Sequence, residues 1–185
     1  MHTTLNRSFY ERDPVTVARE LLGKFLVRRY HDAVFSGKIT EVEAYLKHGD
    51  PASHGSWKRS PIRESLYRRG GHAYVYALRH HFLFNTVTDT EEEPSAVLIR
   101  GIEPCEGIDI MRMLRKRDDM RHFTDGPGKV CQAFGITTAQ DGLDLVGGAD
   151  VWIEDRGVKI AREDIMVTPR IGITKNADAL LRFYI

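Results

Sequence analysis

The sequence predicts a single α+β domain in which a β-sheet is flanked by a few helices. Segments with the alternating polarity and β-branched residues of strands outnumber segments with helical periodicity. The two kinds of segment do not alternate strictly, as they would in a doubly wound parallel sheet. A length of 185 residues suits one domain with a sizeable core. We therefore expect one domain over residues 1–185.

The N-terminal part of the chain predicts one helix, two strands and a long loop. Asp13-Pro14 is typical of a helix start, with Asp as the N-cap and Pro at the first helical position, and Gly23 is typical of a helix end. Residues 24–30 and 33–45 have the composition of strands. Residues 46–71 are rich in Gly, Ser, Pro and Arg, which indicates a long functional loop rather than a linker.

The rest of the chain predicts two further helices among short strands. The amphipathic pattern of residues 104–117 predicts the first of these helices. Gly126-Pro127-Gly128-Lys129 opens a second, short helix that Gly135 closes. The strands are expected over residues 73–78, 82–88, 96–102, 151–154, 166–173 and 181–185.

The composition is that of an ordinary globular protein, with 42% hydrophobic and 29% charged residues. A formal net charge of +1 excludes a globally basic protein, so any affinity for nucleic acid must come from local patches. Cys105 and Cys131 are too few for a disulfide framework, and we expect two buried thiols in a reducing compartment. No apolar run has the length of a membrane span, and the N-terminus lacks the apolar core of a signal peptide. We therefore expect a cytoplasmic protein without a membrane partner.

The most informative strand carries two acids and an aromatic ring on one face. Side chains two positions apart on a strand share a face, so Glu41, Glu43 and Tyr45 point the same way. Crowded carboxylates repel, and at least one should have a raised pKa unless a cation lies beside it. A raised pKa is what a general base needs. Alternatively, this is an edge strand whose acids pair with Lys38 or with arginines, and strand chemistry alone favours that second interpretation.

Arg100 stands out within the apolar strand Ala96–Ile102. A guanidinium in such a strand needs a carboxylate or phosphate partner, because an unpaired buried charge is costly. Glu43 is the partner that we expect.

Basic residues are concentrated in two segments, 55–72 and 112–122. These clusters could bind a phosphate backbone although the chain is nearly neutral, or they could be ordinary solvated surface. The backbone amides and lysine of the Gly126–Lys129 segment could form a phosphate-binding site, or they could be only the start of a helix. The chain has neither an HExxH motif nor paired cysteines, so no metal site is expected. The candidate contacts to a DNA backbone are Lys58, Arg59, Arg63, Arg68, Arg69 and Lys129.

Taken together, these features resemble the alkyladenine DNA glycosylase family, the 3-methyladenine DNA glycosylases of the mammalian type that also occur in bacteria. The matching motifs run in order through nearly the whole chain, and the ordered series is more specific than any single motif. It also reverses the preference stated above for the acidic strand. The motifs are Arg19-Glu20-Leu21-Leu22-Gly23, Glu41-Val42-Glu43-Ala44-Tyr45, Ala52-Ser53-His54, Tyr74-Val75-Tyr76, Val97-Leu98-Ile99-Arg100-Gly101-Ile102-Glu103-Pro104, Gly126-Pro127-Gly128-Lys129-Val130-Cys131-Gln132-Ala133, Pro169-Arg170-Ile171-Gly172-Ile173 and Leu181-Arg182-Phe183-Tyr184.

The resemblance implies a curved antiparallel sheet, no metal and no organic cofactor. It implies that Glu43 is the general base that activates a water to attack C1′, and that Arg100 helps to hold this water. It further implies that the damaged base stacks between Tyr45, His54 and Tyr76. Asn85 would disfavour the exocyclic amine of guanine.

One departure from the family concerns the turn after Tyr76. This turn is slightly shorter than in relatives of the mammalian type, and it lacks the tyrosine that fills the gap left by the flipped base. Arg79, His80 or His81 must fill that space, or nothing does.

The resemblance therefore implies a monofunctional DNA glycosylase that acts on double-stranded DNA containing damaged purines, and we expect a monomer because that fits an enzyme that scans a duplex. It would flip alkylated or deaminated purines, 3-methyladenine foremost and hypoxanthine as a further candidate, and begin base excision repair at the nucleoid of a bacterial cell. Since no lysine is poised as an amine nucleophile, the product should be an abasic site in an uncut strand.

Two other classes of function stay open. The first is a protein that binds lesions without releasing the base. The second is a hydrolase that uses Glu41 and Glu43 on free nucleosides. The pairing of Glu43 with Arg100 argues against the first alternative, and the basic clusters argue against the second.

Overall fold

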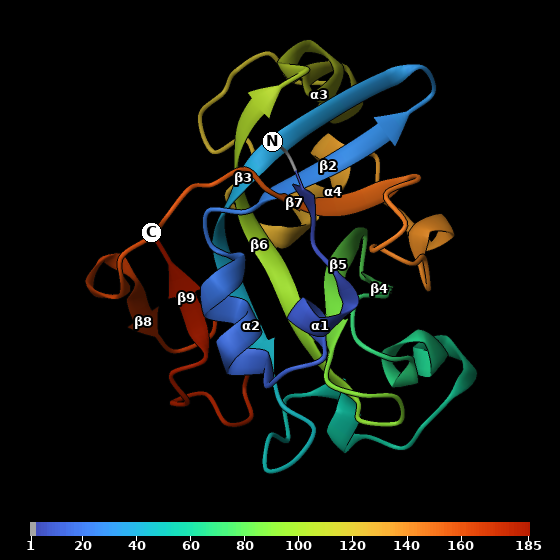
Figure 1. Cartoon of the computed structure of the whole chain (residues 1–185), viewed down its shortest axis with the longest axis vertical. Coiled ribbons are helices and arrows are strands. Elements are labelled where there is room, and N and C mark those ends of the chain that lie inside the picture. Colours follow the sequence, from blue (N-terminus) through green and yellow to red (C-terminus); the bar gives the residue numbers. More distant parts are fainter. Residues whose placement is uncertain (1–2) are drawn as a thin grey trace.

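A computed structural model describes residues 3–185, so the first two residues of the predicted 1–185 domain lie outside it. The described chain forms one nine-stranded sheet in which all neighbouring strands are antiparallel. The predicted α+β class and the curved antiparallel sheet are confirmed (Figure 1). The strands in sheet order are β1 (Thr3–Thr4), β7 (Val151–Asp155), β2 (Phe25–Tyr30), β3 (Ala33–Tyr45), β6 (Ser95–Glu106), β5 (His81–Thr88) and β4 (Ala73–Leu78), with β9 (Arg182–Tyr184) paired to both β3 and β8 (Met166–Thr168).

The two long central strands, β3 and β6, give the sheet its curl. Their pairing is interrupted by register shifts between Ser36 and Gly37 and on both sides of Glu41. Such irregularities bend a strand and increase its twist. Beyond the second shift, β3 also pairs with β9, so β3 bonds to one strand on each side near Glu41 and Glu43.

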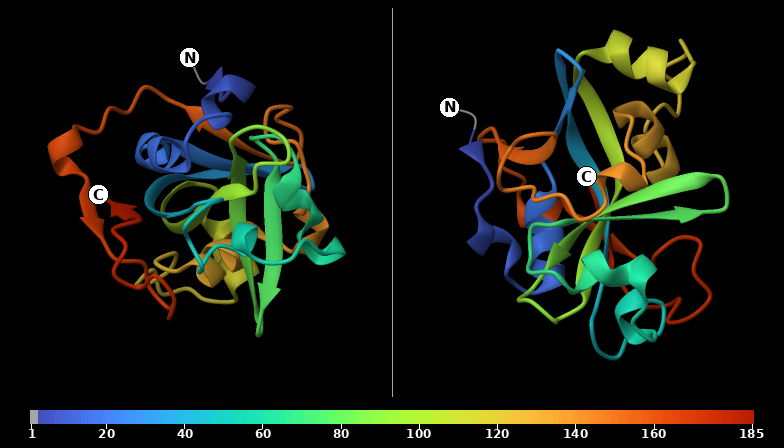
Figure 2. Two further views of the ribbon diagram at one scale, coloured as in Figure 1. Left: turned by 90° about the horizontal axis from the view of Figure 1, so that it is seen from below. Right: turned by 90° about the vertical axis from the view of Figure 1, so that its right-hand side faces the viewer.

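The helices cover both faces of the sheet. Helices α1 (Arg7–Tyr10) and α2 (Pro14–Leu21) lie on one face, and α3 (Ile108–Arg115) and α4 (Pro127–Phe134) lie on the other (Figure 2). Apolar residues of α2 and α4 are buried in the same core cluster as the central strands. The Asp13 carboxylate caps α2 by accepting from the amides of Val15 and Thr16, which confirms the predicted helix start.

The long segment after β3 is irregular, as predicted, but contains two short 3₁₀ helices. These are η1 (His54–Ser56) and η2 (Pro61–Tyr67). Two further 3₁₀ turns, η3 (Thr138–Gln140) and η4 (Arg162–Asp164), lie in the C-terminal third of the chain. Within residues 3–185, no helix has the length and apolar character needed to cross a membrane.

Three predictions about local structure were wrong. The helix predicted over 104–117 spans only Ile108–Arg115, because β6 continues to Glu106 against β3 before Gly107 turns the chain at φ +67°. The strand predicted over 166–173 stops at Thr168, and the following residues form a loop that reaches the sheet face. Cys131 is buried, but Cys105 is exposed, since it lies on the end of β6 beyond the core.

Candidate active site

A cavity of about 510 Å³ opens beside the curled part of the sheet. Its walls come from β3, from the β4–β5 hairpin, from β6, from residues 51–57 and from the loop 171–175. Most of the side chains that the sequence assigned to the site line it: Glu43, Tyr45, His54, Tyr76, Asn85 and Arg100. Trp57, Tyr74 and Lys175 line it as well.

Glu43 lies on β3 with its side chain fully buried. One carboxylate oxygen, Oε1, accepts a hydrogen bond from the backbone amide of Ile171 at 2.8 Å and lies 3.3 Å from Nη1 of Arg100. The other, Oε2, accepts from the Tyr45 hydroxyl at 2.9 Å. Two hydrogen bonds and one ion pair therefore hold this carboxylate in one orientation.

The pKa of Glu43 is raised, mainly because burial removes water from its charged form. The Arg100 guanidinium lowers the pKa, and so do the hydrogen bonds from Ile171 and Tyr45, but the net direction is upward. Glu43 therefore titrates closer to neutral pH than an exposed glutamate. Its geometry and protonation suit a general base.

Arg100 lies between the two acids of β3 rather than beside Glu43 alone. Its Nε donates to Oε1 of Glu41 at 2.9 Å, and Glu41 also accepts from Nε of Arg182 at 2.6 Å. Glu41 stands opposite Gly101 in the sheet, where an added Cβ would lie 2.9 Å from the Cβ of Glu41. The alternative of an edge strand was wrong, because β3 pairs with β2, β6 and β9, and Lys38 pairs with Glu103 instead. Its pairing of an acid with arginines holds for Glu41, whereas Glu43 faces the cavity.

Aromatic rings form the opposite part of the cavity. The His54 ring lies 4.6 Å from that of Tyr76 and 4.5 Å from that of Trp57, measured between centroids. Nδ1 of His54 is 2.6 Å from the Tyr74 hydroxyl. Burial, aided by the nearby Arg63, lowers the pKa of His54 to about 4. The imidazole is therefore neutral at physiological pH.

Asn85 lies at the inner end of the cavity on β5 and is 3% exposed. Its side-chain nitrogen donates to the carbonyls of Tyr74 at 3.0 Å and Leu83 at 3.4 Å. Because both partners are acceptors, they fix the amide orientation and leave its oxygen as an acceptor.

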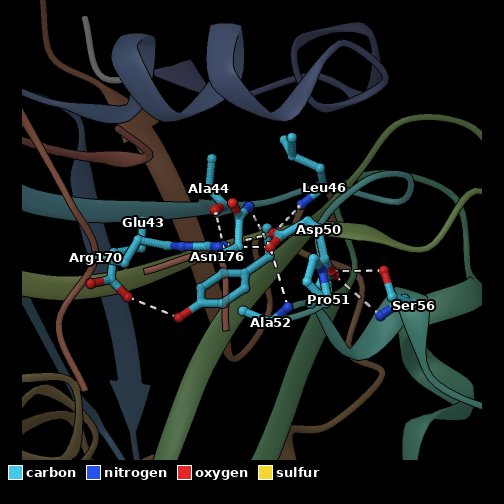
Figure 3. Close-up of polar contacts among 12 residues, drawn as sticks. Glu43, Ala44, Leu46, Asp50, Pro51, Ala52, Ser56, Arg170 and Asn176 are labelled. Carbon is cyan, nitrogen blue, oxygen red and sulfur yellow. Dashed lines mark hydrogen bonds and ion pairs between the residues drawn. The ribbon is translucent and has the colours of Figure 1, made fainter. Parts of the chain in front are cut away.

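A buried ion pair beneath the site was missed by sequence reasoning. Asp50 and Arg170 have fully buried side chains and form two hydrogen bonds of 2.7 Å each (Figure 3). The Pro169–Ile173 motif contained Arg170, but the sequence gives no sign of its partner in the loop after β3. Nor did it place Trp57 or Lys175 at the cavity.

The predicted DNA-backbone cations have different surroundings. Several are already neutralised by acids of the chain: Arg59 by Glu64 and Glu92, Arg69 by Glu11, and Lys129 by Asp125. Arg63 and Arg68 donate to backbone carbonyls. Lys58 has no acidic partner among residues 3–185.

The three gap-filling candidates lie at the end of the β4–β5 hairpin. Arg79 occupies its tip with φ +55°, and His80 follows it. The ring of His81 lies against Gly128 of α4, where an added Cβ would come within 2.9 Å of the imidazole. As for metals, the described residues include no group of three or more His, Cys, Asp or Glu side chains that could hold an ion.

Comparison with known proteins connects this site to an activity. Residues 8–185 match the family described as methylpurine-DNA glycosylase. A protein of Methanoculleus marisnigri is 45% identical, over 98% of this chain and 95% of its own length. One of Carboxydothermus hydrogenoformans is 42% identical, over 98% and 94% of the two chains. Both relatives bear the name "Putative 3-methyladenine DNA glycosylase".

These matches define a hydrolase of base excision repair, an N-glycosylase that acts on DNA. The chain belongs to the methylpurine-DNA glycosylase family. The resemblance found in the sequence is thereby confirmed, and so is its implied activity on methylated purines in DNA.

Proposed function

We propose that this protein is a monofunctional glycosylase that flips 3-methyladenine from duplex DNA into the cavity and releases it with a water activated by Glu43. The observation that carries the proposal is the buried Glu43 carboxylate, held by three donors at a cavity with aromatic walls. A base inside a duplex must leave the stack before its glycosidic bond can be reached. We expect the protein to act as a monomer.

The aromatic walls suit a positively charged methylated purine. Tyr45, Tyr76 and His54 can stack on its faces, and such cation–π contacts contribute up to about 2 kcal/mol when desolvated. The low pKa of His54 matters here, because a neutral imidazole does not repel the cationic base. Asn85 at the inner end would disfavour the exocyclic amine of guanine.

The chemical step resembles glycoside hydrolysis through an oxocarbenium-like state. Glu43 takes a proton from the water as the water oxygen bonds to C1′. The C1′–N bond breaks ahead of this attack and its electron pair leaves with the base, so a cationic base departs as a neutral molecule without an acid. The carboxylate also stabilises the developing positive charge on the sugar. Arg100 favours the anionic form of Glu43 and helps to hold the water.

Hypoxanthine is a second candidate substrate. It is neutral, so its binding in the cavity cannot draw on cation–π attraction and must depend on hydrogen bonds instead. If the Tyr74 hydroxyl donates to Nδ1 of His54, the imidazole proton lies on Nε2 and can be donated to an acceptor on the purine. This assignment predicts that His54→Gln no longer releases hypoxanthine but still releases 3-methyladenine.

For DNA binding, the cations near the cavity mouth without acidic partners are better candidates than the neutralised ones. In the described part of the chain, Lys175 lines the cavity, and Lys58 and Arg79 adjoin the lining residues Trp57 and Leu78. Arg63, whose guanidinium carbon lies 5.6 Å from the centre of the Trp57 ring, is the fourth. At the hairpin tip, Arg79 or His80 would fill the gap left by the flipped base, since the ring of His81 is already packed against α4.

The test is release of free base from methylated duplex DNA by the wild type and by Glu43→Gln. We expect 3-methyladenine release and an uncut abasic strand from the wild type, and release slower by roughly 10²–10⁴-fold from the variant despite intact lesion binding. Lesion binding without release by the wild type would favour the binding-protein alternative. Release from free nucleosides without salt-sensitive duplex binding would favour the nucleoside hydrolase.

A further inference from the structure

We propose that Asp50 and Arg170 are positioning residues for the reaction: their buried ion pair holds Glu43 and Tyr45 in the geometry that activates the water. This inference rests on the proposed role of Glu43. Neither residue lies among the groups that line the cavity, so both act through others.

The pair connects three parts of the chain: β3, the loop that follows β3, and the loop 169–176 (Figure 3). Asp50, in the loop after β3, accepts from both terminal nitrogens of Arg170 and from the amides of Leu46 and Ala52. It also accepts from the side chain of Asn176 at 3.2 Å. The carboxylate thus ties its own loop to the loop 169–176.

Arg170 carries this connection to the reacting carboxylate by three routes. Its Nη1 donates at 3.0 Å to the carbonyl of Ala44, the residue between Glu43 and Tyr45 on β3. Its guanidinium carbon lies 4.6 Å from the centre of the Tyr45 ring, whose hydroxyl donates to Glu43. The next residue, Ile171, gives its backbone amide to Oε1 of Glu43. Two of the three fixed contacts of Glu43 therefore depend on where Arg170 lies.

A purely structural role explains this arrangement less well. Buried ion pairs contribute little net stability compared with well-packed apolar residues, because both charges lose their hydration. A purely structural role also does not explain why Arg170 lies over the ring of Tyr45, the residue whose hydroxyl donates to Glu43. The fork geometry of guanidinium and carboxylate instead fixes orientation as well as distance.

The pair should also act on the charge state of Glu43. The charged and titratable groups around this carboxylate come from several elements, so the effect of Arg170 must be separated from theirs. They are Arg100 on β6, Tyr45 on β3, Tyr76 on β4 and the Arg170–Asp50 pair. Arg182 on β9 acts indirectly, because it bonds to Glu41.

The experiment compares pH profiles of the single-turnover rate of 3-methyladenine release for Arg170→Gln, Arg170→Lys and Asp50→Asn. Arg170→Gln removes a cation that favours the Glu43 anion, so the acid limb of the profile, where Glu43 becomes protonated, should move to higher pH. Asp50→Asn removes an anion from the same place, so its limb should move to lower pH. Arg170→Lys should restore the position of the limb but not the full plateau rate, since lysine lacks the planar fork.

Asp150→Asn is the matched control, because it breaks another ion pair with a buried arginine, Arg28, away from the cavity. It should lower the melting temperature and leave the acid limb in place. Melting temperature and the amplitude of the single turnover separate loss of folded enzyme from loss of rate. If Arg170→Gln does not fold, the direction of the shift in Asp50→Asn decides the question.

Acid limbs that coincide with the wild type in Asp50→Asn and in every folded Arg170 variant would overturn the proposal. Such a result, with Glu43→Gln inactive, would leave the proposed function standing. An active Glu43→Gln would instead remove the proposed function itself.

Discussion

The floor of the cavity and the basic segment 55–72 both place arginines against carboxylates, but in different surroundings. In the cavity, the side chains of Arg100 and Glu43 are 11% and 0% exposed. On the surface, Arg59 is 42% exposed and bridges Glu64 and Glu92, which are more exposed still. The same chemistry therefore sets protonation and orientation in one region and mainly neutralises charge in the other.

Solvent explains the difference. Water and salt screen exposed pairs, and the entropy of holding two long side chains together offsets most of their attraction. Around Glu43, desolvation raises the pKa, and each donor that remains has a large effect on the balance. Substitutions of the donors around Glu43 should thus change the rate and its pH dependence, whereas substitutions of exposed cations should leave both unchanged.

The largest effect among the supporting residues should come from Arg100→Gln. Removal of this cation should slow single-turnover base release by roughly a hundredfold, the scale of losing one fixed electrostatic donor. Because Arg100 lowers the pKa of Glu43, the acid limb should also move to higher pH. Arg182→Gln is the control, since Arg182 bonds to Glu41 but not to Glu43. Equal losses and equal shifts in both variants would contradict the account.

Tyr45→Phe should have the next largest effect. It keeps the stacking ring and removes only the hydroxyl that donates to Oε2 of Glu43. We expect about a tenfold slower release, the cost of a hydrogen bond to a charged group. The limb should shift to higher pH because that hydrogen bond lowers the pKa of Glu43. Tyr74→Phe, which alters the partner of His54, should leave the limb unchanged, and a matching shift there would argue against the assignment.

Lys175→Gln should affect binding and not chemistry. Lys175 lines the cavity mouth and has no acidic partner in residues 3–185. If it contacts a phosphate, the slope of log affinity against log salt should become shallower by about one. The single-turnover rate at saturating enzyme should be that of the wild type. A reduced rate with an unchanged slope would place Lys175 in the chemical step instead.

Arg59→Gln should have the smallest effect. Glu64 and Glu92 already neutralise this arginine, so the salt slope should stay that of the wild type within error. Titrations of duplex DNA at several salt concentrations would measure it beside Lys175→Gln. A loss of slope as large as in Lys175→Gln would show that DNA displaces the two glutamates.

The sequence predicted the features that have local signals. Alternating polarity located β3, and Asp13-Pro14 located the start of α2. Arg100 was singled out because a charged residue in an apolar strand is unusual, although it bonds to Glu41 as well as contacting Glu43. Glu43 was singled out because it shares a strand face with Glu41 and Tyr45, and the family resemblance, not the strand pattern, made it the expected general base.

Features that depend on the folded chain were not predictable in this way. Asp50 and Arg170 are 120 residues apart in the sequence. Neither the loop after β3 nor the loop 169–176 has a sequence pattern that predicts an ion pair. The strand predicted to reach residue 173 stops early because the loop 169–173 bonds to Glu43 and Asp50 instead of to another strand. The burial of Cys105 was wrong for a related reason, since the register of β6 against β3, and not composition, decides where the core ends.

The most direct test of the account compares Glu43→Gln with Glu41→Gln in single-turnover release of 3-methyladenine across pH. The two acids share one strand and one arginine, but only Glu43 faces the cavity. We predict a loss of roughly 10²–10⁴-fold and no acid limb for Glu43→Gln, as expected when a general base is removed. Glu41→Gln should keep most of the rate and its acid limb. A Glu43→Gln variant that releases base as fast as Glu41→Gln would contradict the central claim.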